Sequence, residues 1–136
     1  MTINVVKQYS VFLINEPGAF KNFAELFVRE NVDIIAMSQD VRYDAAVIRL
    51  AVKSEAEISH SLTKAGFTSV KTDAICIDAT NRIGLARDIG AVLSTQGINI
   101  TTIYGSTGPE NTTRWVVVVN DITKALNALE NSGLFN

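Results

Sequence analysis

The sequence has few residues of the kinds that cross-link a chain or bind metals. Its 136 residues include one cysteine and one histidine. A single cysteine cannot form an internal disulfide, and one cysteine with one histidine gives no metal-ligand spacing. We therefore expect no disulfide framework, no metal and no cofactor.

The sequence also lacks an excess of positive charge and a long apolar run. Twelve Lys and Arg against 14 Asp and Glu give a net charge of −2, which does not attract nucleic acid. The longest apolar run, WVVVV at 115–119, is far shorter than the roughly 20 residues that span a bilayer. The N-terminus has no charged segment followed by an apolar one. We expect a cytoplasmic protein with neither a nucleic acid nor a membrane as partner.

What the sequence does contain is enough apolar material for a folded core. Apolar residues make up 47% of the chain, which is typical of a globular protein. The length suits one ordinary domain or two very small ones.

A short loop sequence occurs twice. NEPGAF stands at residues 15–20 and NRIGLA at residues 81–86, which are 66 positions apart (81 − 15) and nearly half the chain. Around the loops only Asn15, Gly18 and Ile34 are identical to their counterparts at this offset. The apolar pattern is shared far more widely, so duplication of one small unit is the first hypothesis.

The residues around each loop predict a strand followed by a helix. Tyr9, Val11 and Leu13 alternate as a strand with one buried face requires, and residues 75–79 repeat that alternation. After each loop the apolar residues follow the spacing of a helix packed on a sheet. They are Phe20, Phe23, Ala24 and Phe27 in the first copy, and Ala86, Ile89, Gly90 and Leu93 in the second.

Each half then continues with a further strand and helix. Residues 45–52 and 114–120 are β-branched strands, and each is followed by a helical pattern. Ser54 and Glu57 predict a capping box for the first of these helices. Asp121 predicts an N-cap for the second.

The order of elements in each half is that of the ferredoxin-like βαββαβ unit. We predict an α+β protein of two such units, residues 1–73 and 74–136, packed as a pseudo-dimer. We expect them to form one extended antiparallel sheet with helices on one face. A unit of this size buries little surface alone, so pairing would stabilise both.

The last strand of the second unit is missing or very short. The sequence ends NSGLFN, which leaves at most a stub at Leu134 and Phe135. An unfinished sheet edge tends to acquire a partner strand. The leading segment INVVKQ (3–8) could cover this edge, either within the chain or across a dimer.

The repeated loop and its neighbouring strand resemble a known family. Asn-x-Pro-Gly at 15–18, followed by NVDI and then IIAMSQD, is similar to the ACT domain, a small-molecule sensor attached to many amino-acid biosynthetic enzymes. The whole chain looks like a stand-alone tandem ACT protein. In that family two units usually form one eight-stranded sheet and bind amino acids in the crevice between them. The resemblance implies a non-catalytic allosteric regulator that forms a homodimer and has a partner enzyme of amino-acid metabolism.

The resemblance also implies which residues line the ligand site. In the loops they are Asn15, Glu16, Pro17, Gly18, Ala19, Asn81, Arg82, Ile83, Gly84 and Leu85. In the opposing second strands they are Met37, Ser38, Gln39, Ile103, Tyr104 and Gly105. Ile83 replaces the proline that the family commonly has, so the second loop is expected to be looser and its site weaker or lost.

The chemistry of such a loop suits an amino acid. A helix N-terminus presents unpaired N–H groups and a partial positive charge to a carboxylate. Gly18 and Gly84 allow the backbone to approach a ligand closely, and Pro17 stiffens the loop. Asn15 can either bind a ligand or close the turn. The ligand's ammonium group would meet carbonyls at the edge of a second strand.

Three alternatives remain open at the level of sequence. The loops contain ordinary turn residues and could serve only to turn the chain. A small enzyme is a second possibility, but no positioned base or anion clamp is visible. The third is a structural module that makes oligomers and binds no ligand.

Other residues that suggest chemistry have simpler explanations. His60 lies on a polar helical stretch without a catalytic partner. Cys76 falls in the middle of a strand, where a thiol is commonly buried and inert. The GSTGPEN segment (105–111) lacks the Lys-Ser/Thr of a P-loop and predicts a flexible hairpin loop. Trp115 opens a strand and is expected to pack in the core.

Overall fold

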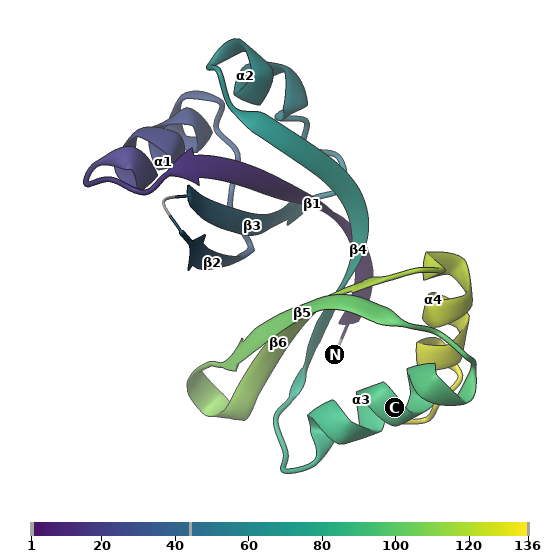
Figure 1. Ribbon diagram of the computed structural model, residues 1–136. Coiled ribbons are helices and arrows are strands. Elements are labelled where there is room, and N and C mark those ends of the chain that lie inside the picture. The colour runs from purple at the N-terminus through teal and green to yellow at the C-terminus, as the bar shows by residue number, and fades with distance from the viewer. Residues whose placement is uncertain (1, 44, 136) are drawn as a thin grey trace. The chain divides into compact units, whose positions relative to one another are not determined.

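The computed structural model describes residues 2–43 and 45–135, and Figure 1 shows their helices and strands. Contacts divide the described chain into two compact units. We call Val6–Thr72 the first unit, and the residues up to Val5 together with those from Asp73 onward the second unit. Both units have the ferredoxin-like arrangement of strands and helices that the repeat predicts.

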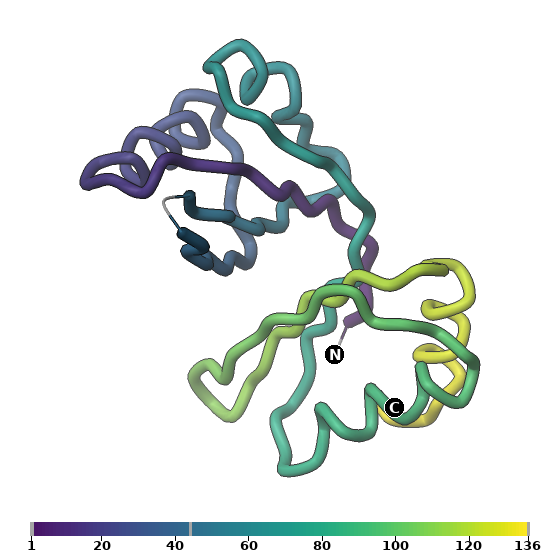
Figure 2. Tube along the Cα trace, viewed as in Figure 1, coloured from purple at the N-terminus to yellow at the C-terminus, as the bar shows by residue number. Residues whose placement is uncertain are grey.

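The first unit contains two helices and four strands, which can be followed along the trace in Figure 2. They are β1 (Thr2–Ile14) from Val6 onward, α1 (Ala19–Arg29), β2 (Ala36–Arg42), β3 (Ala45–Lys53), α2 (Ser59–Lys64) and the first part of β4 (Thr68–Thr80). Its core is formed by Tyr9, Val11 and Leu13 from one face of β1, with both helices packed on that face. The alternation predicted for this strand is therefore confirmed.

The second unit repeats this order from the second part of β4. It continues with α3 (Leu85–Thr95), β5 (Ile100–Thr107), a 3₁₀ turn (Pro109–Asn111), β6 (Thr112–Val119) and α4 (Ile122–Glu130). Ile75, Ile77 and Val117 form the sheet side of its core, and α3 and α4 pack against them. Trp115 packs against the same core, as expected.

The six described strands lie in the order β2-β3-β1-β4-β6-β5 in one antiparallel sheet. β1 and β4 are long because each contributes residues to both units. The resemblance implied a sheet of eight strands, and the described residues form six because β1 and β4 each run through both units. The end strands of the order are β2 and β5.

The start of β1 provides the second unit with its fourth strand. The start of β1 belongs to the second unit, and Ile3 packs against that unit's core. Leu134 and Phe135 form a turn and not a strand, although Phe135 also packs on the core. Of the two ways in which INVVKQ could cover the open edge, the structure shows the one within the chain.

Two local predictions need correction. The expected capping box does not form, because α2 begins at Ser59, and Glu57 instead accepts a hydrogen bond from the Ser59 amide at 2.7 Å. Phe20 lies in the first turn of α1 and is 42% exposed, while Leu26 completes the buried stripe. The N-cap at Asp121 is confirmed, since its carboxylate accepts from the Lys124 amide at 3.1 Å.

Candidate functional site

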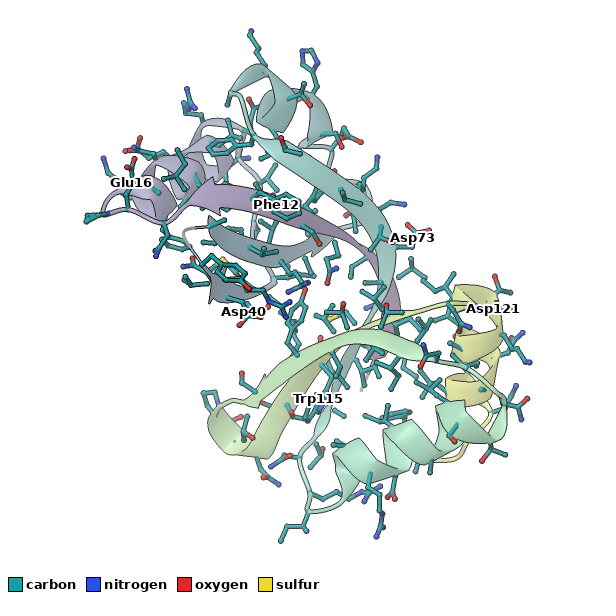
Figure 3. The ribbon with its side chains drawn as sticks, viewed as in Figure 1. Phe12, Glu16, Asp40, Asp73, Trp115 and Asp121 are labelled. Carbon is teal, nitrogen blue, oxygen red and sulfur yellow. The ribbon has the colours of Figure 1, made fainter. Side chains whose placement is uncertain are left out.

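The first repeated loop forms an open corner between β1 and α1. We call Asn15–Ala19 the Gly18 corner; Figure 3 shows the side chains of the protein, with Glu16 of this corner labelled. Gly18 precedes the helix with φ of 87°, a left-handed conformation that favours glycine. The loop is closed by hydrogen bonds from the Glu16 amide to the Ile14 carbonyl (3.0 Å) and from the Ala19 amide to the Glu16 carbonyl (3.2 Å).

Two features of this corner suit a ligand. Apart from Gly18 and its two chain neighbours, no heavy atom of the described residues lies within 4 Å of the position that a Cβ of Gly18 would take. Within residues 2–43 and 45–135, no acceptor is found for the amides of Phe20 and Lys21 in the first turn of α1, and no side chain caps the helix. Unpaired amides at a helix N-terminus can bind an anion such as a carboxylate.

The second repeated loop has the same backbone but different surroundings. We call Asn81–Leu85 the Gly84 corner. Gly84 precedes α3 with φ of 92°. A Cβ at Gly84 would lie 3.5 Å from Nη2 of Arg87 and 3.8 Å from Nη1 of Arg82. Two guanidinium groups therefore face this glycine, whereas no side chain of the described residues lies that close to the Cβ position of Gly18.

The two arginines share the carboxylate of Asp88, and their side chains are 45% and 81% exposed. Asp88 accepts from Nη2 of Arg82 at 2.7 Å and from Nε of Arg87 at 3.1 Å. The hydrogen bond from Arg82, followed by that from Arg87, lowers the pKa of the Asp88 carboxyl below its ordinary value. Asp88 is therefore fully ionised at neutral pH. Sequence analysis missed Arg87 and Asp88, because neither belongs to the repeated loop motif.

A hairpin also ties down the Gly84 corner. The Asn81 amide donates to the Asn111 carbonyl at 2.7 Å, and Nδ2 of Asn111 donates to the Asn81 carbonyl at 3.0 Å. Asn111 lies at the tip of the β5–β6 hairpin, in the residues that the second half has in addition to the first. Of the segment predicted to be a hairpin loop, residues 108–111 are confirmed, whereas residues 105–107 belong to β5. Asn111 anchors the Gly84 corner.

The strand residues predicted to form the opposing walls lie on the end strands. Met37, Ser38 and Gln39 belong to β2, and Tyr104 and Gly105 belong to β5. Within one unit these walls do not meet the loops. In the sheet, Ser38 of β2 pairs with Arg49 of β3, and Arg49 pairs with Ser10 of β1. Ser10 lies four residues before the end of β1, where the loop begins. That separation is about 14 Å along the strand, at roughly 3.4 Å per residue.

The same offset occurs in the second unit. Tyr104 of β5 pairs with Val116 of β6, and Val116 pairs with Cys76 of β4. Cys76 lies four residues before Thr80, the last residue of β4. A site that uses both a loop and a second-strand wall therefore needs the wall of a different ACT-like unit. Neither unit assembles such a site by itself.

Two predicted site residues have clear structural roles. Leu85 is buried in the core of the second unit, so only its backbone is available to a ligand. Gly105 lies under the indole ring of Trp115, where a Cβ would be 2.8 Å from the ring and 2.5 Å from the Arg114 carbonyl oxygen. Glycine is needed at this position for packing. Ile83, by contrast, is fully exposed.

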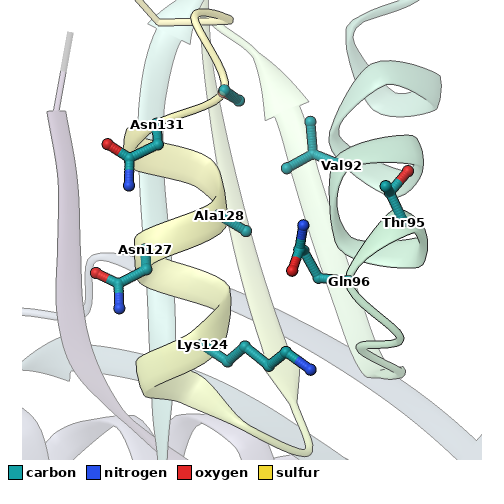
Figure 4. Close-up of a pocket in the computed structure, with 8 residues that line it drawn as sticks. Val92, Thr95, Gln96, Lys124, Asn127, Ala128 and Asn131 are labelled. Carbon is teal, nitrogen blue, oxygen red and sulfur yellow. The ribbon is translucent and has the colours of Figure 1, made fainter.

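Two hollows of the described surface lie away from these corners. A groove of about 450 Å³ runs between α3 and α4, with Val92, Gln96, Lys124 and Ala128 among its lining residues. In Figure 4, Asn127 and Asn131 point away from α3. A second hollow lies beside the C-terminal end of α1. Neither includes a residue of the Gly18 corner or of the Gly84 corner.

The part of the chain that the structure describes contains no cluster of three or more His, Cys, Asp or Glu side chains placed to hold a metal. Cys76 is buried, and burial, followed by the charge of Asp78, raises the pKa of its thiol. A raised pKa makes the thiol a poor nucleophile. Across the described residues, no helix is long and apolar enough to cross a membrane.

Comparisons with known proteins agree with this architecture. The family model described as an ACT domain pair matches residues 1–133. Protein BT0572 from Bacteroides thetaiotaomicron is 26% identical, with a TM-score of 0.82 over 96% of this chain and 90% of that one. A search of the curated proteins gives no significant match.

Two regulatory subunits of aspartate kinase have the same fold. The ligand-free subunit from Thermus thermophilus has a TM-score of 0.69 at 12% identity and covers 98% of this chain and 97% of its own. The subunit from Thermus flavus has a TM-score of 0.62 at 14% identity, with 97% of each chain covered. The duplicated βαββαβ units and the family match over almost the whole sequence lead to one conclusion: the chain belongs to the ACT domain pair family.

Proposed function

We propose that this protein is a non-catalytic cytoplasmic regulator that binds a small amino acid at the Gly18 corner. The observation that carries the proposal is the open start of α1, where a glycine with free space beside it precedes two unpaired amides. Membership of the ACT domain pair family supports a sensing role. The similarity in fold to regulatory subunits of aspartate kinase supports a partner enzyme in amino-acid metabolism.

The ligand's carboxylate is assigned to the amides of Phe20 and Lys21. The partial positive charge of the helix end stabilises an anion there by about 0.3–1 kcal/mol. Pro17 restricts the loop, so less conformational entropy is lost on binding. The ammonium group then meets backbone carbonyls on the second strand of another ACT-like unit.

The charge of the corner narrows the class of ligand. Glu16 is exposed in the loop and its carboxylate is close in sequence to the assigned amides. Like charges at short range repel, so a second carboxylate on the ligand is disfavoured. Amino acids with neutral or basic side chains should bind better than aspartate or glutamate.

A thermal-shift screen of the common protein amino acids tests the proposal. A ligand that binds only the folded state raises the melting temperature by mass action. At least one neutral or basic amino acid should do so. Gly18→Trp should abolish the shift because the side chain fills the open corner.

Gly66→Trp is the matched control. Gly66 also has a left-handed φ, of 91°, and free space around it, but it lies after α2 and away from the corner. Both substitutions therefore introduce similar backbone strain, while only the first blocks the ligand. If no amino acid shifts the wild-type melting temperature, the proposed function is wrong.

A second role, self-association through the end strands, is favoured by a specific observation. β5 consists of ITTIYGST and has no charged residue or proline, the features that usually prevent strand edges from pairing. We propose that this edge pairs with another copy of the chain to form a homodimer, and that ligand binding shifts this equilibrium. Ile103→Lys should then yield a monomer in sedimentation velocity. An unchanged sedimentation coefficient in that variant would exclude β5 as the interface.

A further inference from the structure

One flank of α1 carries an exposed apolar stripe. Phe20, Ala24 and Val28 are spaced four residues apart, so they lie one above another on the helix. Phe20 is 42% exposed and Val28 is 79% exposed. Ala24 and Val28 also line the hollow beside the C-terminal end of α1, together with residues 32–34, which lead into β2. The stripe therefore lies on the side of α1 that faces the β2 edge of the first unit.

The end strand β2 extends this apolar surface. Met37 pairs with Leu50 and Val41 pairs with Ala46, and residues paired in this way share a face of the sheet. Leu50 and Ala46 belong to the core under the helices, so Met37 and Val41 lie on the helix side of the sheet. They are nevertheless 40% and 51% exposed, because β2 ends the sheet of the described residues. Contiguous exposed apolar surface of this kind marks an interaction site.

The equivalent stripe of the second unit is built from small residues. At the offset of 66 it consists of Ala86, Gly90 and Ser94, on α3. Beyond its chain neighbours and the backbone of α3, no heavy atom of the described residues lies within 4 Å of the Cβ position of Gly90. The flank of α3 is therefore low and open. Because both units have the same arrangement of elements, the bulky stripe on α1 is not a requirement of the fold.

The two stripes are complementary in size. Helices pack with their axes about 8–10 Å apart, at a distance set by the side chains between them, so a bulky ridge fits well over a ridge of small residues. The strand edges beside the stripes differ as well, since β5 has no charged residue and β2 contains Asp40 and Arg42. A contact between two first units would leave the unprotected β5 edges uncovered. A contact between two second units would leave the apolar stripes on α1 uncovered.

We propose that the homodimer forms between unlike units, with β2 and α1 of one copy packed against β5 and α3 of the other. In a two-fold dimer this contact occurs twice and covers every stripe and edge. The proposal rests on the self-association through β5 proposed above, and it names the surface that β5 meets. If the sheet continues across the contact with the helices on one face, the two edge strands run antiparallel. Ala24 then lies opposite the partner's Gly90, and Val28 lies opposite the partner's Ala86.

Disulfide formation between two cysteine variants tests which units meet. Ala24→Cys and Gly90→Cys each place a thiol at the centre of one stripe. The two variants are mixed in urea, refolded together and oxidised, and intact mass then distinguishes the three possible dimers. We expect the mixed dimer, linked between positions 24 and 90, to dominate. Each variant oxidised alone should stay unlinked, as should the wild type, whose Cys76 is buried.

Like-with-like pairing gives the opposite result in this experiment. Ala24→Cys or Gly90→Cys would then form a disulfide-linked dimer with itself as readily as with the other variant. That outcome would overturn the proposal. The absence of every cross-link from a protein that sediments as a dimer would overturn it too.

A charge placed on the stripe provides a second test. Val28→Lys should yield a monomer in sedimentation velocity, because the lysine would have to be buried against the small residues of α3. Val70→Lys is the matched control, since Val70 is 58% exposed but lies on β4, which is not an end strand. That variant should remain a dimer. A dimer in Val28→Lys, or a monomer in both variants, would exclude the stripe as the contact.

The sedimentation of the wild-type protein separates this inference from the self-association on which it rests. A monomeric wild type would refute both. A dimeric wild type whose variants cross-link like with like would leave the self-association standing and refute only the pairing of unlike units.

Discussion

Replacing Gly105 by alanine should destabilise the protein, although the change adds only one methyl group. That methyl group would lie 2.5 Å from the Arg114 carbonyl oxygen and 2.8 Å from the Trp115 ring. The oxygen belongs to β6, which pairs with β5, so it cannot move away without disturbing the ladder. Overpacking of this kind costs roughly 1–3 kcal/mol. Alanine recovers about 0.5–1 kcal/mol of backbone entropy, which leaves a net loss of about 1 kcal/mol.

Gly90→Ala is the control for this prediction because its expected sign is opposite. Gly90 lies inside α3, and no atom is found within 4 Å of its Cβ position. Alanine is favoured over glycine in a helix interior by about 0.8–1 kcal/mol. Both variants change glycine to alanine in the same unit, so their difference isolates the contact with Trp115.

Urea unfolding followed by tryptophan emission is a suitable assay. Trp115 is the single tryptophan of the chain and packs on the core of the second unit, so its emission reports on that unit. Gly105→Ala should lower the urea midpoint, and its native emission should shift because the ring is displaced. A midpoint equal to or above the wild-type value would refute the packing of the indole over Gly105.

Two further predictions concern the supplied strand and a surface network. Ile3→Ala should destabilise the second unit by about 1–2 kcal/mol. The loss is smaller than for a fully buried isoleucine because Ile3 is only partly buried. Urea unfolding followed by Trp115 emission measures this change in stability. The pKa of the Glu57 carboxyl is lowered from 4.5 to about 2. The main cause is a hydrogen bond from the Ser59 amide, followed by hydrogen bonds from the Ser59 side chain and from Lys71. The ionised Glu57 carboxylate therefore stabilises the fold fully above pH 4.5, and this stabilisation is lost as the pH falls through about 2. The difference in urea midpoint between wild type and Glu57→Gln should shrink to nothing over that range.

Much of the fold could be predicted from the sequence because it depends on local pattern. The alternation of Tyr9, Val11 and Leu13 marks the buried face of a strand wherever that strand lies. Asp121 caps its helix through a bond that spans three residues. Gly18 and Gly84 mark left-handed positions because other residues rarely adopt them. The capping box was wrong because α2 begins at Ser59, later than the pattern of Ser54 and Glu57 required.

What only the tertiary structure decided are the contacts between residues far apart in the chain. Ile3 packs on the core of the second unit, although about seventy residues separate it from the rest of that unit. The sequence left open whether the leading segment covers this unit within one chain or across a dimer. Asn111 donates to the Asn81 carbonyl and Asp88 pairs with Arg82, although neither Asn111 nor Asp88 belongs to the repeated motif. The repeat by itself specified two similar corners, since local pattern fixes backbone conformation. Which side chains lie beside each glycine depends on the fold, and no periodicity records that.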